Sequence, residues 1–564
     1  MGVQVPPFAL PSERFSATAE GHLLERSPAP DSRARRADLL GFLACAILSS
    51  AYCVSTAVEI GPTFDEPDYV NLGMVRWRTW GHNLFMHAGI MPLSAEVQTF
   101  PLWVAEVASG ERFDVLTDAT PFLPWARAAN LPFWWAVLWY GGYLGRQLAG
   151  GWGGRLATAW LAGEPNLLAH ASLATTDLSI TACLLGLFAY YRAGRADEPA
   201  RWLRRVGLPM YLFGLAVLAK ASAVVFGPLV LLAVELERFV RTRRAGVLDA
   251  VQILGGGFVL AVIYFGLGSA GSFRGEEGEK HHPHGRIGES LWTVNRYARS
   301  NAVGAITFQM KHQEDGHGGC VLFGEWHPTG VWYYFPVALA LKTSLPLLVA
   351  LLGVAVVRPR YSANVLLLAA GLLLAYSLAA RVQIGIRLFL PVIAFAVIGV
   401  SAALVRWRER SVSAWCRRLI PVAATVAVGW TAVGSLAVWP NALGFANELA
   451  GGPSRNHLNL SDSNHDWGQG LPELAAWQRA HPDVPLCVWY FGTDPLLRSG
   501  PWTPFDPRPV PSAELANRLR GHRLAVSTTH LSDPAGARFR AMRPTARTTT
   551  FLIFEWSKTT AVGN

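Results

Sequence analysis

Long apolar runs separated by short polar gaps make up most of the chain. A helix needs about 20 mostly apolar residues to cross a bilayer, and runs of about that size lie at residues 38–58, 131–149, 153–171, 177–193, 247–270, 331–356, 363–380, 384–404 and 419–438. The run 206–236 is too long for one span and contains Lys220, so we predict two short helices that turn around at 220–222. The pattern predicts a mainly α-helical, polytopic membrane protein of about 11 transmembrane helices.

Polar stretches divide the chain into three predicted parts. Residues 1–37 are rich in Pro, Ser and Arg, which predicts a disordered cytoplasmic tail ahead of the first span and not a cleaved signal peptide. Residues 38–439 form the membrane domain, with outer loops at about 59–130 and 271–330. Residues 440–564 predict a small outer α+β domain, with strands in "PLCVWYFG", "HRLAVSTTHL" and "TTTFLIFEW" and a helix over 471–481.

One stretch of the first outer loop, "VNLGMVRWRTWGHNLFM", has apolar residues at roughly helical spacing, and Arg76 and Arg78 lie beside them. The apolar positions are Val70, Met74, Trp77 and Leu84. We predict an amphipathic helix at the membrane interface.

The distribution of charge predicts the orientation of the chain. It has 49 Lys and Arg against 39 Asp and Glu, a net charge of +10, yet only 16% of its residues are charged, where a soluble protein has about a quarter. The arginines gather at 33–36, 192–205, 238–244, 358–360 and 406–418, all on one side of an 11-span topology. By the positive-inside rule, the N-terminus is cytoplasmic and the C-terminus lies outside. This placement accounts for the basic balance, so no nucleic-acid partner is expected.

Ionisable residues recur at the predicted outer ends of several spans. Asp65 and Glu66 follow the first span in "EIGPTFDEPDYV", and His170 and Asp177 flank the next outer turn in "EPNLLAHASLATTDLSI". Lys220 lies at another outer turn, Arg387 enters a span in "QIGIRLFLP", and Arg381 and Lys342 lie nearby in the sequence. Helix capping or snorkelling explains each residue singly. Neither explains why acids and cations share one level of the membrane.

A sugar donor linked to a lipid phosphate is one substrate that would need this arrangement. Its chain lies in the bilayer, cations hold its phosphate as leaving group, and a carboxylate takes the proton of an acceptor hydroxyl. The chain has no GxxxxGK[ST] or GxGxxG nucleotide motif. Two alternatives remain open: a membrane transporter, which would use ionisable residues nearer mid-membrane, and a polysaccharide polymerase or ligase that uses lipid-linked donors.

Several sequence pieces resemble a known family. They include "TFDEPDY", "PNLLAHASLATTD", "GLAVLAKAS", "GHGGCVLFGEWHPTGVWYYFPVALALKTSLP", "IGIRLFLPVIAF", "ALGFANELAGGPSRNHLNLSDSNHDWGQGL" and "VWYFGTDP", in order through nearly the whole chain. The chain is similar to the bacterial branch of glycosyltransferase family 39, the polyprenyl-phosphate-mannose:protein mannosyltransferase-like enzymes of the GT-C superfamily, which are related to the lipid A aminoarabinose transferases.

This resemblance implies roles for the outer-face residues. Asp65 matches the catalytic base, with Glu66 its neighbour in the acidic pair, and Asp177 matches a second acidic position. Lys220 and Arg387 match basic positions that we assign to the donor phosphate, and His170 joins them on the same face. The resemblance implies a polyprenyl-phosphate-linked sugar as donor, a protein, lipid or glycan as acceptor, and a multi-pass protein of the bacterial plasma membrane. It implies no cofactor, and dependence on a divalent metal stays open.

The remaining polar motifs carry weaker predictions. Asp462, Asn464 and Asp466 of "SDSNHDWGQG", together with Glu473 shortly after it, approach the spacing of a calcium loop, but Trp467 stands where such a loop needs Gly. We therefore predict a turn in which Asp462 and Asp466 are structural or face the acceptor, and we give His317 a similar place. His281, His282 and His284 have no zinc-ligand register, which favours a polar loop. Cys320 and Cys487 are the two cysteines in polar regions and could pair in an oxidising compartment.

Overall fold

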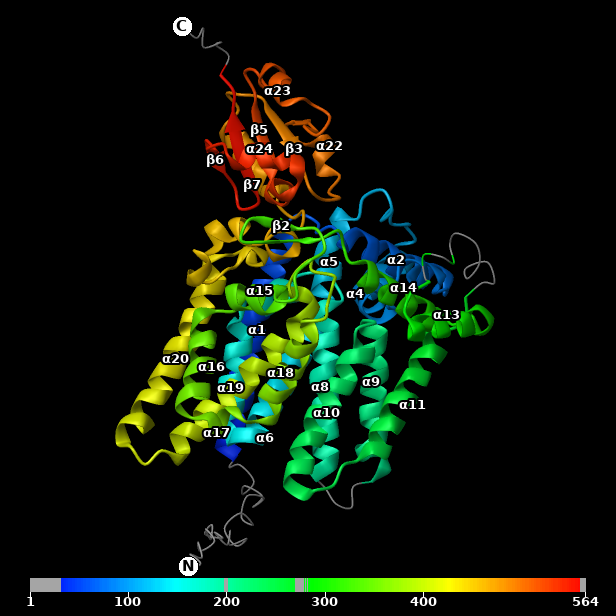
Figure 1. Ribbon diagram of the computed structural model, residues 1–564, viewed down its shortest axis with the longest axis vertical. Helices are drawn as coiled ribbons and strands as arrows, with labels where there is room; N and C mark the ends of the chain where they lie inside the picture. Colours follow the sequence, from blue (N-terminus) through cyan, green and yellow to red (C-terminus); the bar gives the residue numbers. More distant parts are fainter. Residues whose placement is uncertain (1–31, 197–200, 269–277, 279, 281, 558–564) are drawn as a thin grey trace, which may run out of the picture.

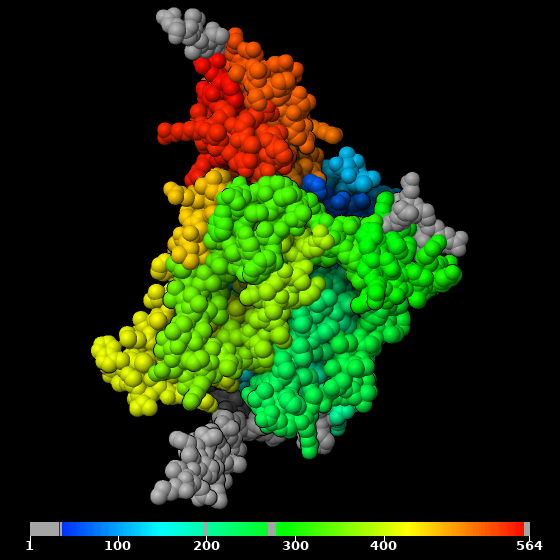
Figure 2. Space-filling view, viewed as in Figure 1, coloured from blue at the N-terminus to red at the C-terminus, as the bar shows by residue number. Residues whose placement is uncertain are grey.

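The computed structural model describes residues 32–196, 201–268, 278, 280 and 282–557. Figure 1 shows a bundle of long helices, a layer of short helices and loops over one end of it, and a small sheet domain beyond that layer. Figure 2 shows the sheet domain as a separate lobe standing on this layer. We call the end of the bundle under the layer the loop end and the opposite end the basic end, because the arginine-rich gaps lie there.

The bundle is built from the predicted apolar runs. Its helices are α1 (Ser32–Glu59), α6 (Leu131–Gly163), α8 (Asp177–Ala196), α9 (Leu208–Ala219), α10 (Ala223–Thr242), α11 (Val247–Phe265), α15 (Tyr334–Lys342), α16 (Leu345–Val357), α17 (Pro359–Ser362), α18 (Val365–Ser377), α19 (Leu390–Arg410) and α20 (Ala414–Ala437), with a π turn η2 (Leu203–Gly207) and a 3-10 turn η4 (Ile386–Phe389). Four helices of the described residues are long and apolar enough to span a membrane alone, or five if a bent pair counts as one span. The protein is therefore membrane-embedded, and the count of eleven spans stays a prediction.

The apolar runs break at polar or small residues. α6 has non-helical backbone at Ala149 and Gly150, which divides it into two legs where two spans were predicted. The run 206–236 forms two helices that end and begin on either side of residues 220–222, as predicted. Two runs predicted as continuous spans are broken in the structure: the run 331–356 bends by 114° between α15 and α16, and the run 153–171 breaks at Glu164, which caps α7 (Pro165–Ala171).

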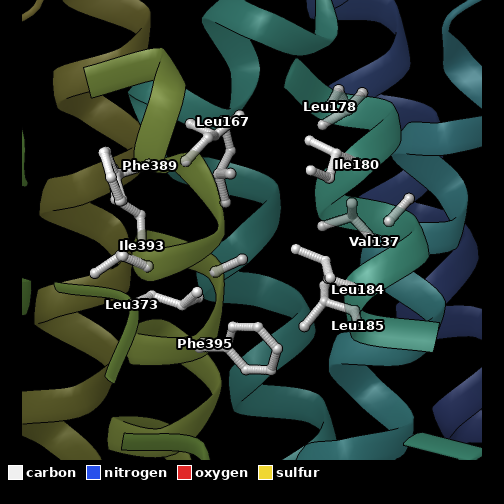
Figure 3. Close-up of a cluster of buried hydrophobic side chains, with 14 of the residues drawn as sticks. Val137, Leu167, Leu178, Ile180, Leu184, Leu185, Leu373, Phe389, Ile393 and Phe395 are labelled. Carbon is white, nitrogen blue, oxygen red and sulfur yellow. The ribbon is translucent and has the colours of Figure 1, made fainter. Parts of the chain in front are cut away.

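The start of α19 and the helices around it form the centre of the core. Its apolar window is 94% buried, against 22–28% for the spans in α1, α11 and α20. In Figure 3, Ile393 and Phe395 of α19 and Phe389 of η4 face α8, α6, α7 and α18, through Leu178, Ile180, Leu184, Leu185, Val137, Leu167 and Leu373. A helix that is apolar all round is expected at such a central place, and it carries the neighbouring η4 turn into the loop end.

The layer at the loop end is formed by the two large loops. It contains α2 (Glu66–Thr79), α3 (Asn83–His87), α4 (Pro92–Ser109), η1 (Thr120–Phe122), α5 (Leu123–Ala128), α13 (Arg286–Ala298), α14 (Asn301–Asp315) and the hairpin of β1 (Cys320–Leu322) and β2 (Glu325–His327). The single amphipathic helix predicted over 70–84 is present only in part, because α2 covers its first ten residues and a separate helix, α3, begins at Asn83. α2 ends at Thr79, and its C-cap Trp80 has left-handed backbone at φ 59°. Val70 and Met74 are buried in one cluster with Leu102 and Val115.

The C-terminal domain has the predicted α+β composition. Its five-stranded mixed sheet has the order β4-β3-β5-β7-β6, with β3 parallel to β4 and β5 and the other pairs antiparallel. The strands are β3 (Leu486–Trp489), β4 (Thr503–Pro504), β5 (Arg523–Ser527), β6 (Ala546–Arg547) and β7 (Phe551–Glu555), and the helices are α21 (Leu471–Ala480), α22 (Leu496–Ser499), α23 (Ser512–Arg518) and α24 (Ala537–Arg540). The three predicted strands and the helix are present.

Short 3-10 turns connect this domain to the bundle: η5 (Ala442–Gly444), η6 (Glu448–Ala450), η7 (Pro453–Leu458) and η8 (Asp462–Asn464) precede the sheet, and η9 (Thr528–Ser532) and η10 (Pro534–Gly536) follow β5. The suggested pairing of Cys320 and Cys487 is not found. Cys320 lies in β1 and Cys487 in β3, and both are free thiols.

Candidate functional site

A buried ion pair fixes the backbone on which the first acidic residues stand. Glu66 is 0% exposed, and its two oxygens accept from Nε and Nη2 of Arg127 at 2.8 and 2.6 Å. The same oxygens accept from the backbone N–H groups of Ala174 and Thr63. Arg127 also donates to the carbonyls of Ala57, Ile60 and Gly61. These bonds hold the end of α1, the start of α2, α5 and the turn before α8 together.

This arrangement leaves Glu66 without a free oxygen for substrate. Burial by itself raises the pKa of Glu66, but the charge and hydrogen bonds of Arg127 outweigh it and hold the pKa below its usual range. The carboxylate is therefore ionised and committed to the scaffold. Its neighbour Asp65 occupies the N-cap position of α2 without making a capping hydrogen bond, so its oxygens are available to other groups.

Four of the predicted site residues meet above the core. Asp65 Oδ2 lies 3.1 Å from Nη1 of Arg387, and the same nitrogen lies 3.8 Å from Asp177 Oδ2. The other carboxylate oxygen of Asp177 forms an ion pair with Lys220 Nζ. Each residue comes from a different place in the chain: the start of α2, the start of α8, the η4 turn and the break between α9 and α10. We call this set the charge cluster.

The members of the charge cluster differ in exposure. The side chain of Asp177 is 0% exposed and that of Arg387 is 7% exposed, whereas that of Asp65 is 29% exposed. Asp177 is therefore committed to holding the two cations. Asp65 is the acid of the cluster that reaches the aqueous side.

Unsatisfied polar atoms lie next to these charges. Asp177 Oδ2 and His170 Nδ1 are both buried and have no hydrogen-bond partner, and His170 is within electrostatic range of Asp177, Arg387 and Lys220. Native proteins satisfy nearly all buried polar groups. Two unsatisfied atoms beside a charge cluster indicate a place where a ligand completes the hydrogen bonding.

The stretch 461–470 forms one wall of the charge cluster. The guanidinium carbon of Arg387 lies 4.0 Å from the centre of the Trp467 ring, and its Nε donates to Ser463 Oγ at 3.2 Å. Asn464 accepts from the backbone N–H of Ile386 and donates to the hydroxyl of Tyr334. The residue that excludes a calcium loop, Trp467, is thus a direct partner of Arg387 through a cation–π contact.

The two aspartates of this stretch have different surroundings. Asp466 is buried and accepts from the backbone N–H groups of Gly468 and Thr529 and from the hydroxyl of Thr528, which ties it to η9. Asp462 is half-buried and lies within electrostatic range of Arg387. Burial raises the pKa of Asp466 to about 6 and that of Asp462 to about 7, although Arg387 opposes the shift at Asp462.

The residues whose spacing approaches that of a calcium loop do not form a calcium site in the structure. Glu473 accepts from the backbone N–H and the hydroxyl of Thr549 instead. Among the described residues, no three His, Cys, Asp or Glu side chains are grouped closely enough to hold a metal ion.

A pair of histidines lies at the outer rim of the site. His317 Nδ1 and His312 Nε2 are 2.9 Å apart, and His317 is within electrostatic range of Arg387 and Asp65. Burial and the nearby charges lower the pKa of both rings. In the other histidine cluster, the ring of His282 contacts Trp292 and the backbone of His284 donates to Glu314, while His281 lies outside the described residues.

The two remaining candidate cations do not reach the charge cluster. Lys342 is buried, and its Nζ donates to the carbonyls of Leu443 and Asn464 at 2.6 Å, so it anchors the wall from below. Arg381 is exposed, and its backbone N–H donates to Gln313. Sequence reasoning missed Arg127 and Tyr69, and it considered Trp467 only as the residue that excludes a calcium loop. Tyr69 follows Asp65 by one helical turn, a spacing that could have drawn attention to it, and lies within electrostatic range of Asp65, Arg387 and Asp177.

Two solved structures are similar to the chain over most of its length. Both are of ArnT from Cupriavidus metallidurans. The one bound to undecaprenyl phosphate is 15% identical with a TM-score of 0.44 and covers 91% of this chain and 97% of its own; the apo state is 16% identical, also with a TM-score of 0.44, and covers 92% and 98%. ArnT is an aminoarabinose transferase of the GT-C group.

A third similar structure is the oligosaccharyltransferase of Archaeoglobus fulgidus tethered to an acceptor peptide, also a GT-C protein. It is 13% identical with a TM-score of 0.38, and the match covers 69% of this chain and 55% of that one. No family model and no curated protein matches the chain. At these identities and TM-scores, the likenesses assign no function to it.

Proposed function

We propose that the protein is a membrane glycosyltransferase that moves a sugar from a polyprenyl-phosphate donor to an acceptor hydroxyl. One observation carries the proposal: Nη1 of Arg387 lies 3.1 Å from Asp65 and 3.8 Å from Asp177, and Asp177 also pairs with Lys220. Two cations and a partly exposed acid are thereby held at one level, directly above apolar helices. This level suits a substrate whose chain lies in the bilayer and whose phosphate lies at its surface.

The charges of the cluster suit an incoming phosphate. Arg387 and Lys220 are balanced by Asp65 and Asp177, so the four side chains have no net formal charge. A phosphate oxygen can replace Asp65 at Arg387, because a guanidinium binds phosphate as well as carboxylate. Asp177 then keeps both cations in place. The ring of Trp467, 4.0 Å from the guanidinium carbon, limits the orientations that Arg387 can take.

Once a phosphate oxygen has displaced the Asp65 carboxylate from Arg387, that carboxylate would be free to act as a base. The acceptor oxygen forms a bond with the anomeric carbon, the bond from that carbon to the phosphate oxygen breaks with its electron pair, and the acceptor proton goes to Asp65. Attack opposite the phosphate inverts the anomeric centre. Arg387 and Lys220 stabilise the charge that develops on the leaving phosphate. In this proposal Glu66 positions the α2 backbone and does not touch substrate.

The test compares Asp65→Asn with Asp68→Asn. Asp68 lies in the first turn of the same helix and is exposed, which makes it a matched control. Donor and acceptor are first identified by mass spectrometry, which compares glycoproteins, glycolipids and polyprenyl-phosphate sugars from cells with and without the gene. Transfer is then followed in isolated membranes. We expect Asp65→Asn to lower the rate by about 100-fold or more with unchanged membrane insertion, and Asp68→Asn to keep it. Full activity in Asp65→Asn would remove Asp65 as the base, and identical glycan and lipid profiles with and without the gene would contradict the proposed function and favour a transporter.

A further inference from the structure

A cavity of about 340 Å³ lies between three helices, far from the charge cluster. Its walls are the second leg of α6, the last turns of α19 and the first half of α20. α19 begins beside Arg387 and reaches the cavity near Arg408, and this stretch of about 21 residues corresponds to about 30 Å of helix. The cavity therefore lies in the half of the bundle toward the basic end (Figure 1), and the proposed transfer reaction does not use it.

The lining of the cavity is apolar except at two arginines and Thr425. Trp152 lines one wall and is 59% exposed, so the cavity lies at the outer surface of the bundle, which contacts lipid. Its volume falls within the range of protein sites for small organic ligands, about 300–1,000 Å³. A hydrocarbon chain from the surrounding bilayer fits such a surface, whereas a soluble polar ligand would not.

The two arginines give the cavity a charged end. Nε of Arg408 is buried and has no hydrogen-bond partner. Arg155 pairs with Asp38 at 2.6 Å and lies over the ring of Trp152 at 4.8 Å. No carboxylate is among the lining residues. The cavity thus combines an apolar wall with two guanidinium groups, one of which has an unsatisfied donor.

We propose that this cavity binds one anionic glycerophospholipid of the leaflet at the basic end. An acyl chain lies along α6 and α20, and the phosphate accepts hydrogen bonds from Arg408 and Arg155. Basic pockets between transmembrane helices recognise anionic head groups in this way. Such a lipid would contact the second half of α6, the last turns of α19 and the first half of α20. It would stabilise the bundle because it binds the folded protein and not the unfolded chain.

The test measures lipid bound to the full-length protein in detergent. We expect phosphatidylglycerol to co-purify, as detected by native mass spectrometry, and to raise the thermal unfolding midpoint when added to delipidated protein, whereas phosphatidylcholine does neither. The double variant Arg155→Gln/Arg408→Gln is expected to need at least tenfold more phosphatidylglycerol for the same shift. Arg410→Gln is the matched control, because Arg410 is exposed two residues further along α19 and does not line the cavity.

A second variant tests the apolar wall of the cavity. It also keeps the proposal testable if the double arginine variant does not fold. Ala424→Leu narrows the cavity while both arginines remain, and is expected to weaken phosphatidylglycerol binding to a similar degree. Equal stabilisation by phosphatidylcholine, unchanged binding in both variants, or equal stabilisation by inorganic phosphate alone would each overturn the proposal. Dimerisation of the lipid-free protein through this cavity would also overturn the proposal, since a second copy of the chain would then be the occupant.

Discussion

Arg387 joins the acids of the candidate site to the wall formed by residues 461–470. It contacts two carboxylates, an aromatic ring and a serine hydroxyl while its side chain is only 7% exposed. A buried cation is tolerated only when it is paired and hydrogen-bonded, and removing one partner of such a pair costs several kcal/mol. The same arrangement makes Arg387 available to a ligand, because Asp65 is partly exposed and a phosphate could take its place.

The surroundings of Glu66 predict that replacing it with Gln lowers the stability of the protein. Glu66→Gln leaves the guanidinium of Arg127 buried without its counter-charge, although that group keeps its bonds to three backbone carbonyls. Breaking one side of a buried ion pair costs about 3–5 kcal/mol. We expect the thermal unfolding midpoint in detergent to fall clearly, while Asp68→Asn changes stability by less than about 0.5 kcal/mol. Equal midpoints for the two variants would show that the Glu66–Arg127 pair does not hold α2.

Asp462 predicts a dependence of stability on pH. Its pKa is raised to about 7 in the folded protein by burial, against about 3.9 in an unfolded chain. Between about pH 4 and 7 the folded state holds a proton that the unfolded state has released, so stability from this group is present at low pH and lost as the pH rises to 7. The thermal midpoint of Asp462→Asn relative to the unchanged protein should therefore increase with pH over this window.

His465, in the same stretch, provides a control whose contribution to stability changes with pH in the opposite direction. Burial lowers the pKa of His465 to about 3, so the unfolded chain binds a proton there that the folded protein does not, and stability from this group is gained as the pH rises through about 6.5. The midpoint of His465→Gln relative to the unchanged protein should decrease over the same window. Parallel slopes for the two variants would contradict the assigned protonation states.

At the scale of elements, the site depends on how the η4 turn fits against η8. Gly385 precedes η4 with φ at 151°, and a Cβ atom there would lie 2.1 Å from Ser463 Oγ. That hydroxyl also accepts from Arg387 and donates to the carbonyl of Ile384. The close approach of the two turns therefore requires glycine at 385 and fixes the direction of Arg387.

Gly385→Ala tests this contact. The added methyl group must push Ser463 and η8 away, which is expected to cost about 1–3 kcal/mol of stability and to weaken donor binding because Arg387 loses its fixed orientation. Gly371→Ala is the control, since a Cβ atom at 371 in α18 would meet no atom within 4 Å. Donor titration and thermal unfolding of both variants provide the measurements. Unchanged donor affinity in Gly385→Ala would separate the η4–η8 contact from the site.

The elements also show which features the sequence pattern could predict. Apolar periodicity located the runs that became helices and strands, and the positions of polar residues at their ends located Asp65, Asp177, Lys220 and Arg387. The bend between α15 and α16 was missed because residues 343 and 344 look polar but not helix-breaking. Their extended backbone is held by distant partners, since Lys342 donates to the carbonyl of Leu443 and the side chain of Asn447 donates to the carbonyl of Thr343. Pairs such as Glu66 with Arg127 or Arg387 with Trp467 join residues 61 and 80 positions apart, and no local pattern encodes such a distance.

At the scale of the whole molecule, the two ends of the bundle have different chemistry. Acids and cations are paired in the charge cluster at the loop end, and the sheet domain covers that end through bonds such as that of Thr493 to the carbonyl of Phe64. The opposite end has arginine-rich connections, among them residues 406–418. This asymmetry is what the positive-inside rule predicts for a protein whose loop end faces away from the cytoplasm.

The orientation can be measured with single cysteines. Ser413 lies in the connection between α19 and α20, Ser512 begins α23 in the sheet domain, and both are exposed. A membrane-impermeant maleimide should label Ser512→Cys in spheroplasts and Ser413→Cys only after the membrane is permeabilised. The unchanged protein is the background control, because its six cysteines are buried or partly buried. Labelling of Ser413→Cys without permeabilisation would place the basic end outside. It would also place the charge cluster on the cytoplasmic side, and the proposed donor would then have to present its phosphate and sugar on that side of the membrane.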